Sequence, residues 1–191
     1  MKELLKEIRN CTVCAESLPF GPNPVVRASA KSQILIIGQA PGKKVHESSI
    51  PWNDQSGDNL RRWLGVDEET FYDASKIALV PMGFCYPGTG KSGDLPPRPE
   101  CAPLWHERLL KLMPHLELTI LVGNYAQAYY LKGNIRKTLT ETVKNYESYL
   151  PTYWPLPHPS PRNNIWQAKN PWFAKEVLPG LKSRMEGILK L

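Results

Sequence analysis

The stretch Gln33-Ile34-Leu35-Ile36-Ile37-Gly38-Gln39-Ala40-Pro41-Gly42 decides the fold of this chain. Its first half is a short, β-branched-rich apolar run, which is typical of a strand buried in a parallel sheet. The run ends in a Gly-x-x-Pro-Gly loop, where glycine removes the Cβ and proline makes the turn rigid. Such a loop can bring backbone N–H groups close to a ligand, although an ordinary strand-to-helix turn has the same composition.

Similar apolar runs occur at residues 77–80 and 118–122, and a weaker one at 152–156. Segments with apolar residues at helical spacing surround them. These segments are residues 1–9, 57–64, 104–112, 125–131 and 173–189, the last interrupted by Pro179-Gly180. Because strands alternate with helices, we predict an α/β fold, a three-layer α/β/α sandwich around a short, mainly parallel four-stranded sheet. The chain has no internal repeat, so residues 1–191 are expected to form a single domain.

The composition is that of a globular protein with a polyanionic partner. Of the 191 residues, 41% are hydrophobic and 22% charged, and the net charge is +6, which favours binding to nucleic acid. The amphipathic N-terminal segment differs from a signal peptide, and no apolar stretch reaches the roughly 18 residues that a membrane span needs. We therefore expect a monomeric, cytoplasmic protein without a membrane partner.

A second proline-rich loop, His158-Pro159-Ser160-Pro161-Arg162-Asn163, follows the weakest predicted strand. The prolines on both sides of His158 restrict its backbone, so that its imidazole can be aimed at a ligand. A histidine is more often a satisfied core residue, but the Ser, Arg and Asn that follow suit contact with an anion. Since ligands bind at the carboxyl ends of parallel strands, residues 38–42, 81–86 and 157–163 are expected to meet there.

With both loops in view, the chain resembles the uracil-DNA glycosylase superfamily, most closely its iron-sulfur family 4 branch. That branch has a Gly-Glu-Ala-Pro-Gly loop, which Gly38 to Gly42 match with Gln39 in place of Glu. Its C-terminal loop begins His-Pro-Ser or His-Pro-Ala, and the loop from His158 also resembles that of the single-strand-selective relatives. The resemblance covers nearly the whole chain. It implies a monofunctional DNA glycosylase that hydrolyses the N-glycosidic bond of uracil or another deaminated base in base excision repair.

Four cysteines stand at Cys11, Cys14, Cys85 and Cys101. A C-x-x-C pair can bind one metal centre from a tight turn, but the second pair is too widely spaced for a typical zinc site. From spacing alone, zinc, a cluster and simple burial stay comparable. The resemblance implies that all four hold a [4Fe-4S] cluster with a structural role, joining residues 1–20 to the loop from 84 to 101.

The segment Pro51-Trp52-Asn53-Asp54 corresponds to the family's Pro-Phe-Val-Gly, whose ring stacks on the flipped base. Trp52 would offer a larger stacking face, unless it is a core anchor. The family's uracil-reading Asn has no counterpart in Val80-Pro81-Met82-Gly83-Phe84-Cys85. A pocket lined by Met82 and Phe84 would accept a different or damaged base, or Asn53 would reach in from the neighbouring loop.

For catalysis, the resemblance points to His158 as the donor that stabilises negative charge on the departing base. Backbone N–H groups of Gln39 and Ala40 would add to this effect, with Gly38, Pro41 and Gly42 completing the substrate-binding loop. The Gln39 side chain cannot act as a base, so Asp54 is our first candidate for activating water and Glu47 the second. The third alternative is that neither does, since capture of an oxocarbenium ion by water demands little of a base. Ser160, Arg162 and Asn163 would contact the DNA backbone beside the flipped nucleotide.

The segment at residues 87–93, Pro-Gly-Thr-Gly-Lys-Ser-Gly, lacks the spacing of a phosphate-binding P-loop and is interpreted as a flexible basic loop that faces DNA. Two alternatives to the glycosylase remain. One is a catalytically weak or inactive lesion-binding protein on the same fold, and the other is a metal-stabilised scaffold with an unrelated ligand.

Overall fold

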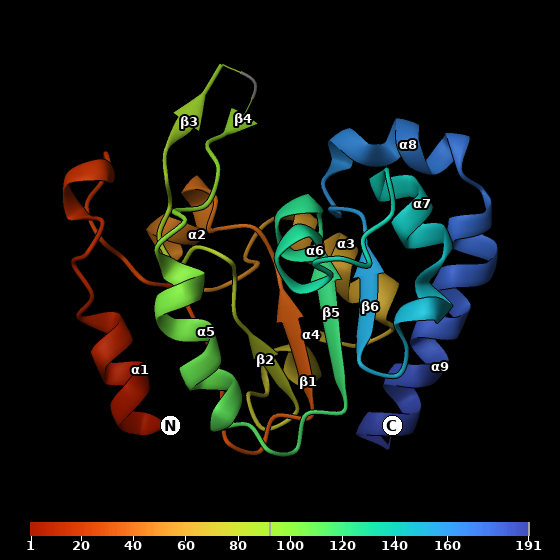
Figure 1. The fold of residues 1–191 in the computed structure, drawn as a ribbon, viewed down its shortest axis with the longest axis horizontal. Coiled ribbons are helices and arrows are strands. Elements are labelled where there is room, and N and C mark those ends of the chain that lie inside the picture. The colour runs from red at the N-terminus through yellow and green to blue at the C-terminus, as the bar shows by residue number, and fades with distance from the viewer. Residues whose placement is uncertain (92, 191) are drawn as a thin grey trace.

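A parallel four-stranded sheet, in the order β2-β1-β5-β6, forms the centre of the computed structural model, which describes residues 1–91 and 93–190 (Figure 1). The register places Ile34 opposite both Ile77 and Leu118. An isolated antiparallel bridge from Arg27 to Leu79 covers the β2 edge. The predicted α/β class and mainly parallel sheet are confirmed. The strands are β1 (Ile34–Ile37), β2 (Ile77–Leu79), β5 (Leu118–Val122) and β6 (Tyr153–Leu156).

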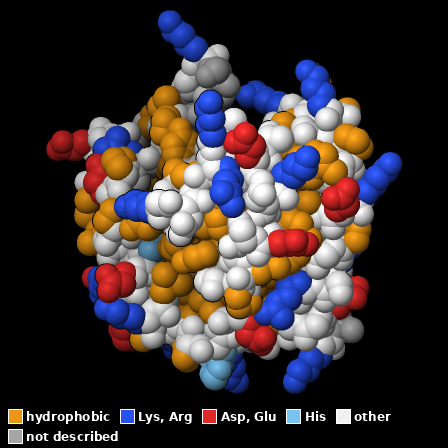
Figure 2. Space-filling model, turned by 45° about the vertical axis from the view of Figure 1, so that its right-hand side comes forward, with side chains coloured by type: hydrophobic (Ala, Val, Ile, Leu, Met, Phe, Trp, Pro, Cys, Tyr) orange, Lys and Arg blue, Asp and Glu red, His pale blue; other side chains and the backbone are white. Residues whose placement is uncertain are grey.

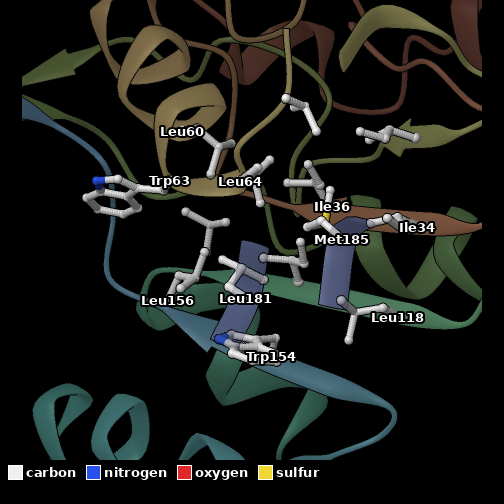
Figure 3. Packing of buried hydrophobic residues seen from close by; sticks show 14 of the residues in the cluster. Ile34, Ile36, Leu60, Trp63, Leu64, Leu118, Trp154, Leu156, Leu181 and Met185 are labelled. Carbon is white, nitrogen blue, oxygen red and sulfur yellow. The ribbon is translucent and has the colours of Figure 1, made fainter. Parts of the chain in front are cut away.

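Helices cover both faces of the sheet, because successive side chains of a strand point to opposite faces. Ile34 and Ile36 pack with α3 (Gln55–Leu64), α4 (Glu68–Tyr72) and α9 (Leu178–Leu189), as Figure 3 shows for part of this cluster. On the other face, Leu35 and Ile37 pack with α1, α5 and α6. Each fully buried Leu or Ile contributes roughly 1.5–3 kcal/mol of transfer free energy. The helices of this second face are α1 (Lys2–Arg9), α5 (Cys101–Lys111) and α6 (Asn124–Tyr130).

The C-terminal helical segment is continuous where the sequence predicted an interruption. A π-helical turn, Phe173–Val177, leads directly into α9. Pro179 is the second residue of α9, and the π-helical turn before it continues into α9 without a break. The expected break at Pro179-Gly180 is therefore wrong.

Several short elements were not predicted. The segment at residues 87–93 contains most of a small antiparallel hairpin, so its interpretation as a flexible loop is corrected for the residues that the structure describes. In Figure 1 this hairpin rises at the carboxyl end of the sheet, next to α2. No helix in the described part of the chain has the length and apolar character to cross a bilayer. The unpredicted elements are β3 (Thr89–Gly90), β4 (Gly93–Asp94), α2 (Lys43–Ser48), α4, α7 (Leu139–Lys144) and α8 (Asn164–Lys169).

Candidate active site

A cavity of about 520 Å³ lies where the loops after β1 and β6 meet. The segment before α3 and the hairpin β3-β4 complete its wall. This position, outside the carboxyl ends of parallel strands, is where α/β folds bind ligands. The residues that line it are Val25, Gly38, Gln39, Ala40, Pro41, Gly42, Val45, Pro51, Trp52, Asp54, Ser56, Pro81, Thr89, Gly93, Asp94, His158, Ser160 and Arg162.

The loop after β1 is fixed by the segment after β2. The carbonyl oxygen of Gly38 accepts a hydrogen bond from the Met82 N–H at 2.9 Å, and that of Gln39 accepts one from the Gly83 N–H at 3.0 Å. The Gln39 side-chain amide donates to the Leu95 carbonyl at 3.4 Å and so points toward the hairpin. Because an amide cannot take a proton from water, Gln39 can act on a substrate only as a hydrogen-bonding group.

Trp52 lies between the first loop and His158. Its φ of 59° is in the left-handed region, which is costly for a residue with a side chain. A Cβ on Gly38 would lie 2.7 Å from Trp52 Cζ2, and one on Gly57 would lie 1.8 Å from the Trp52 carbonyl oxygen. The Trp52 and His158 ring centroids are 5.9 Å apart, with their planes at 32°. Two glycines thus make room for a half-buried indole that faces the cavity and also packs against the core.

The loop that begins at His158 is fixed by side-chain amides. Asn163 donates its amide N–H to the His158 carbonyl at 2.7 Å. From α3, Asn59 donates to the Pro159 carbonyl at 2.8 Å, which connects this loop to the segment that carries Trp52. The position of this loop, which the sequence analysis attributed to prolines, is therefore also fixed by two asparagines.

The protonation state of His158 follows from its contacts. The backbone N–H of Ser160 donates to His158 Nδ1 at 3.2 Å, so Nδ1 must be an acceptor. In the neutral ring the proton is then on Nε2, which is left as the donor. Burial lowers the pKa of His158 below its ordinary value, and the nearby Asp54 carboxylate opposes this shift only in part. The ring is therefore neutral near pH 7, with a fixed tautomer.

Asp94, at the end of β4, is a cavity residue that sequence reasoning missed. Its carboxyl pKa is raised, mainly by burial and further by the Asp54 carboxylate, while the Arg162 guanidinium and a hydrogen bond with Tyr86 oppose the shift. The Arg162 guanidinium also lies against Gly93, where a Cβ would come within 2.9 Å of it. The hairpin and the second loop thus meet at the cavity, where the opposite charges of Asp94 and Arg162 influence each other. In the sequence, Asp94 is a single acidic residue in a Gly- and Pro-rich segment, and nothing in that pattern predicts a place in the cavity.

A family model described as the Uracil DNA glycosylase superfamily matches residues 26–182. That match includes every residue that lines the cavity except Val25. The chain belongs to this superfamily. Members of the superfamily are typically glycosylase hydrolases that act on DNA, so the cavity is the candidate active site of a DNA glycosylase.

Within this glycosylase fold, most of the predicted site residues meet at the cavity, but some do not. Met82 and Phe84 are buried in the core, so the expected base pocket lined by them is wrong. Asn53 is exposed and outside the cavity lining, and Asn163 serves the loop and not the cavity. Glu47 is exposed and pairs with Lys43 at 4.0 Å, away from the cavity.

The four cysteines all line one small, mainly apolar cavity, and none forms a disulfide. Burial raises the pKa of the Cys85 thiol to about 11 and that of Cys101 to about 12. Arg98 also lines the cavity and pairs with Glu100 at 2.6 Å. Among the described residues, no group of three or more His, Cys, Asp or Glu side chains is arranged to hold a single metal ion.

Behind the active site, a buried network supports Pro81. His106 Nε2 lies 3.0 Å from the Pro81 carbonyl oxygen, and its Nδ1 lies 2.6 Å from the Tyr130 hydroxyl. Since the carbonyl can only accept, Nε2 carries the proton and Tyr130 donates to Nδ1. Burial lowers the pKa of His106 to about 4, so the ring is neutral and α5, α6 and the segment after β2 are connected without a charge.

Proposed function

We propose that this chain is a monofunctional DNA glycosylase of the iron-sulfur family 4 branch, which hydrolyses the N-glycosidic bond of uracil or another deaminated base. One observation carries the proposal: a neutral His158 with Nδ1 occupied by the Ser160 N–H and Nε2–H left to donate at the cavity. Acidic, deaminated bases leave as anions. A fixed donor aimed at the departing base is what such a leaving group requires.

In the proposed reaction, the bond between C1′ and the base nitrogen breaks and its electron pair goes to the base. His158 Nε2–H donates a hydrogen bond to the base oxygen on which this charge collects. Because the ring is neutral, it needs no proton transfer to do so, and its low pKa keeps it in this form. Removing one donor of this kind typically lowers the rate by about a hundredfold or more.

Water then adds to C1′, and its proton is released to solvent or to a nearby carboxylate. Asp54 lines the cavity, but its Oδ1 also accepts the Gly57 N–H at 2.9 Å as the N-cap of α3. Its second oxygen remains as the candidate acceptor for a water proton. Asp94 lines the same cavity from the opposite hairpin and is a second candidate, because its raised pKa brings the carboxyl closer to the operating pH, where a general base is most effective.

The DNA backbone would contact Ser160 and Arg162 at the rim of the cavity. On the face drawn in Figure 2, Lys and Arg side chains are dispersed among acidic and apolar ones. Dispersed charge gives modest, salt-sensitive affinity for any DNA. Recognition of the damaged base would therefore depend on the cavity, where Trp52 is a lining residue that would stack on an extruded base.

The cofactor we propose is a [4Fe-4S] cluster held by Cys11, Cys14, Cys85 and Cys101. Its support is an all-sulfur donor set around a single apolar cavity, with Leu18, Phe84 and Trp105 in the wall. Among the described residues, no three ligands are arranged around a single ion, so the proposal rests on the shared cavity and the four sulfur donors, and zinc on the same thiolates is the alternative. When bound, the cluster would supply a covalent link between the N-terminal segment and the loop before α5.

A second candidate is a lesion-binding protein with little turnover. It is favoured by one observation, the replacement of an acid by Gln39, whose amide is engaged with the hairpin. Both candidates bind DNA, and they differ in whether a base is released.

A panel of oligonucleotides with uracil, hypoxanthine or xanthine, treated with alkali after incubation, tests the proposal. Strand breaks are expected with at least one of them, and a His158→Ala variant should lose about a hundredfold or more of that rate. Retarded but intact DNA across the panel would favour the lesion-binding protein instead. Uracil release by His158→Ala at the wild-type rate would show that His158 has no part in the reaction.

A further inference from the structure

An exposed aromatic ring lies close to the cavity without belonging to it. The Phe20 side chain is 58% exposed, and one of its faces stacks on Tyr86, with 5.7 Å between centroids and 24° between planes. Tyr86 itself is fully buried, and its hydroxyl lies 2.5 Å from that of Thr89, which lines the cavity. Phe20 is also 5.9 Å from the ring of His46, the residue after cavity-lining Val45. The ring is therefore one layer of side chains away from the proposed base site.

The segment that carries Phe20 is fixed on both sides. Pro19 packs against Gly88, where an added Cβ would lie 2.9 Å from Pro19 Cγ. Asn23 donates its amide to the His46 carbonyl at 2.8 Å and to the Ser49 hydroxyl at 3.0 Å. An exposed ring on a rigid segment loses little conformational entropy when a flat ligand stacks on its open face.

The surroundings favour a nucleotide as that ligand. Phe20 lies against α2, which begins next to the cavity loop and exposes Lys43 and Lys44. Aromatic rings beside basic residues are the usual elements of single-strand binding surfaces, where successive bases stack and phosphates are neutralised. Such a site must also lie close to the place where the target base is bound. Tyr86 and His46, whose rings contact each other and Phe20, connect it to the cavity wall.

We propose that Phe20 is the stacking site for the base of a nucleotide flanking the one that is excised, on an unpaired DNA strand. The proposal rests on the proposed function, since it assumes that the 520 Å³ cavity takes the target base. It assigns to the N-terminal segment a direct role in binding DNA. It also predicts that single-stranded DNA is a better ligand than a duplex, in which the flanking base is already stacked.

The test measures the affinity for short single strands with one central uracil by fluorescence anisotropy. All proteins carry His158→Ala, so that the uracil is not removed during the measurement. Three strands are compared, with normal flanks, with an abasic analogue on the 5′ side of the uracil, and with one on the 3′ side. Phe20→Ala should weaken binding to the normal strand by about fivefold or more. For the protein that keeps Phe20, one of the two abasic strands should bind more weakly than the normal strand, by the same factor. On that abasic strand, Phe20→Ala should cause no further loss of affinity.

Two matched variants serve as controls. Phe20→Trp should bind at least as tightly as the parent, because it keeps the stacking face. Leu112→Ala removes an apolar side chain that is 38% exposed at the far end of α5, and it should not change binding. Thermal unfolding of each variant separates loss of contact from loss of fold.

The proposal fails if Phe20→Ala binds the normal strand as its parent does, or if its effect is equal on all three strands. Base release by the otherwise unmodified chain is measured in parallel. Binding without base release would contradict the proposed function, and the comparison of the three strands would then still test the role of Phe20. Absence of binding to every strand would overturn both.

Discussion

Gly57 shows how a single residue can determine the shape of the candidate active site. Its N–H caps α3 through Asp54, and a Cβ at this position would lie 1.8 Å from the Trp52 carbonyl oxygen. Gly57→Ala must therefore displace Trp52 or the start of α3, at a cost of roughly 2–4 kcal/mol in the free energy of unfolding. Urea titration followed by tryptophan fluorescence measures this loss.

Gly187→Ala is the matched control, because Gly187 is an exposed residue of α9 with no atom within 4 Å of an added Cβ. It should raise the free energy of unfolding by about 0.5–1 kcal/mol, the usual gain for alanine in a helix. Equal effects of the two substitutions would contradict the contact with Trp52.

Asp54 combines a structural and a proposed chemical role, which two substitutions can separate. Asp54→Asn keeps an oxygen to accept the Gly57 N–H and should change the free energy of unfolding by less than about 0.5 kcal/mol. Asp54→Ala loses the cap and should cost about 1 kcal/mol. If Asp54 activates water, both variants release base at least about tenfold more slowly in single-turnover assays.

A slow rate in Asp54→Ala alone would assign to Asp54 only the role of a helix cap. Asp67→Asn is a suitable control, since Asp67 caps α4 in the same way through the Thr70 N–H at 2.8 Å, and it is not a cavity residue.

A hydrogen bond connects α3 to the loop that begins at His158, and its loss should affect both stability and rate. Asn59 donates to the Pro159 carbonyl at 2.8 Å, and this contact holds His158 relative to Trp52. Asn59→Ala removes this hydrogen bond and the one that Asn59 Oδ1 accepts from the Arg62 guanidinium, and it should lower the free energy of unfolding by about 1–2 kcal/mol. Because positioning errors of about an ångström can cost a hundredfold in rate, base release should fall by much more than stability.

Single-turnover assays with excess enzyme measure the rate of base release by Asn59→Ala, and thermal unfolding is measured on the same samples. Asn145→Ala, which loses a side-chain hydrogen bond to the Glu141 carbonyl at the end of α7, is the comparison. Parallel losses of rate and stability in Asn59→Ala would argue against a positioning role.

The neutral His106 between α5 and α6 makes the fold sensitive to acid. Its pKa is about 4 in the folded protein and 6.5 ordinarily, so below pH 6.5 the unfolded chain binds the proton first. The contribution of neutral His106 to the free energy of unfolding is fully present above pH 6.5. It is lost as the pH falls toward 4 and amounts to on the order of 3 kcal/mol in all. Buried His158, whose pKa is also lowered, adds to the same trend.

Unfolding midpoints between pH 7.5 and about pH 4.5 test this linkage. His106→Gln can still donate to the Pro81 carbonyl but does not titrate, so its stability should be lower at neutral pH and should fall less steeply. A pH dependence identical to that of the unmodified chain would exclude His106 as the cause.

Among the elements, the sequence predicted the long and strongly patterned ones. The sheet strands were predicted to within one residue at each end, because a run such as Ile34–Ile37 is apolar on both faces and ends at glycine. Helices α2 and α7 were missed, since six residues hold too few apolar positions for a helical period to be seen. The hairpin β3-β4 is even shorter, and its glycines and the prolines that flank it are equally typical of a loop.

For the candidate site, the sequence predicted which loops meet but not how individual side chains face. Met82 was expected in the cavity, yet its N–H bonds to Gly38 while its side chain turns into the core. Asp94 was missed, because its place in the cavity depends on a hairpin that brings it back over Gly42. Side-chain direction after a strand depends on tertiary contacts that spacing along the chain does not encode.

At the scale of the whole molecule, four cysteines from two distant segments meet at one cavity. If they hold the proposed cluster, Cys85→Ser should lose the bound iron and the visible absorbance of the protein. Because metal-binding energy adds to folding energy, its unfolding midpoint should also fall by roughly 5–10 °C. Anaerobic purification, iron analysis and thermal scans measure these effects, and a colourless, iron-free but fully active parent chain would refute the cluster.

In Figure 1 the start of α1 and the end of α9 both lie at the end of the sheet opposite the hairpin β3-β4, whose residues line the cavity. These two helices cover different faces of the sheet. A fluorescent tag, a surface tether or a fused protein attached at either end would project away from the bound strand. The chain could therefore be immobilised, or fused to a programmable DNA-targeting module, with its reaction side open to solution.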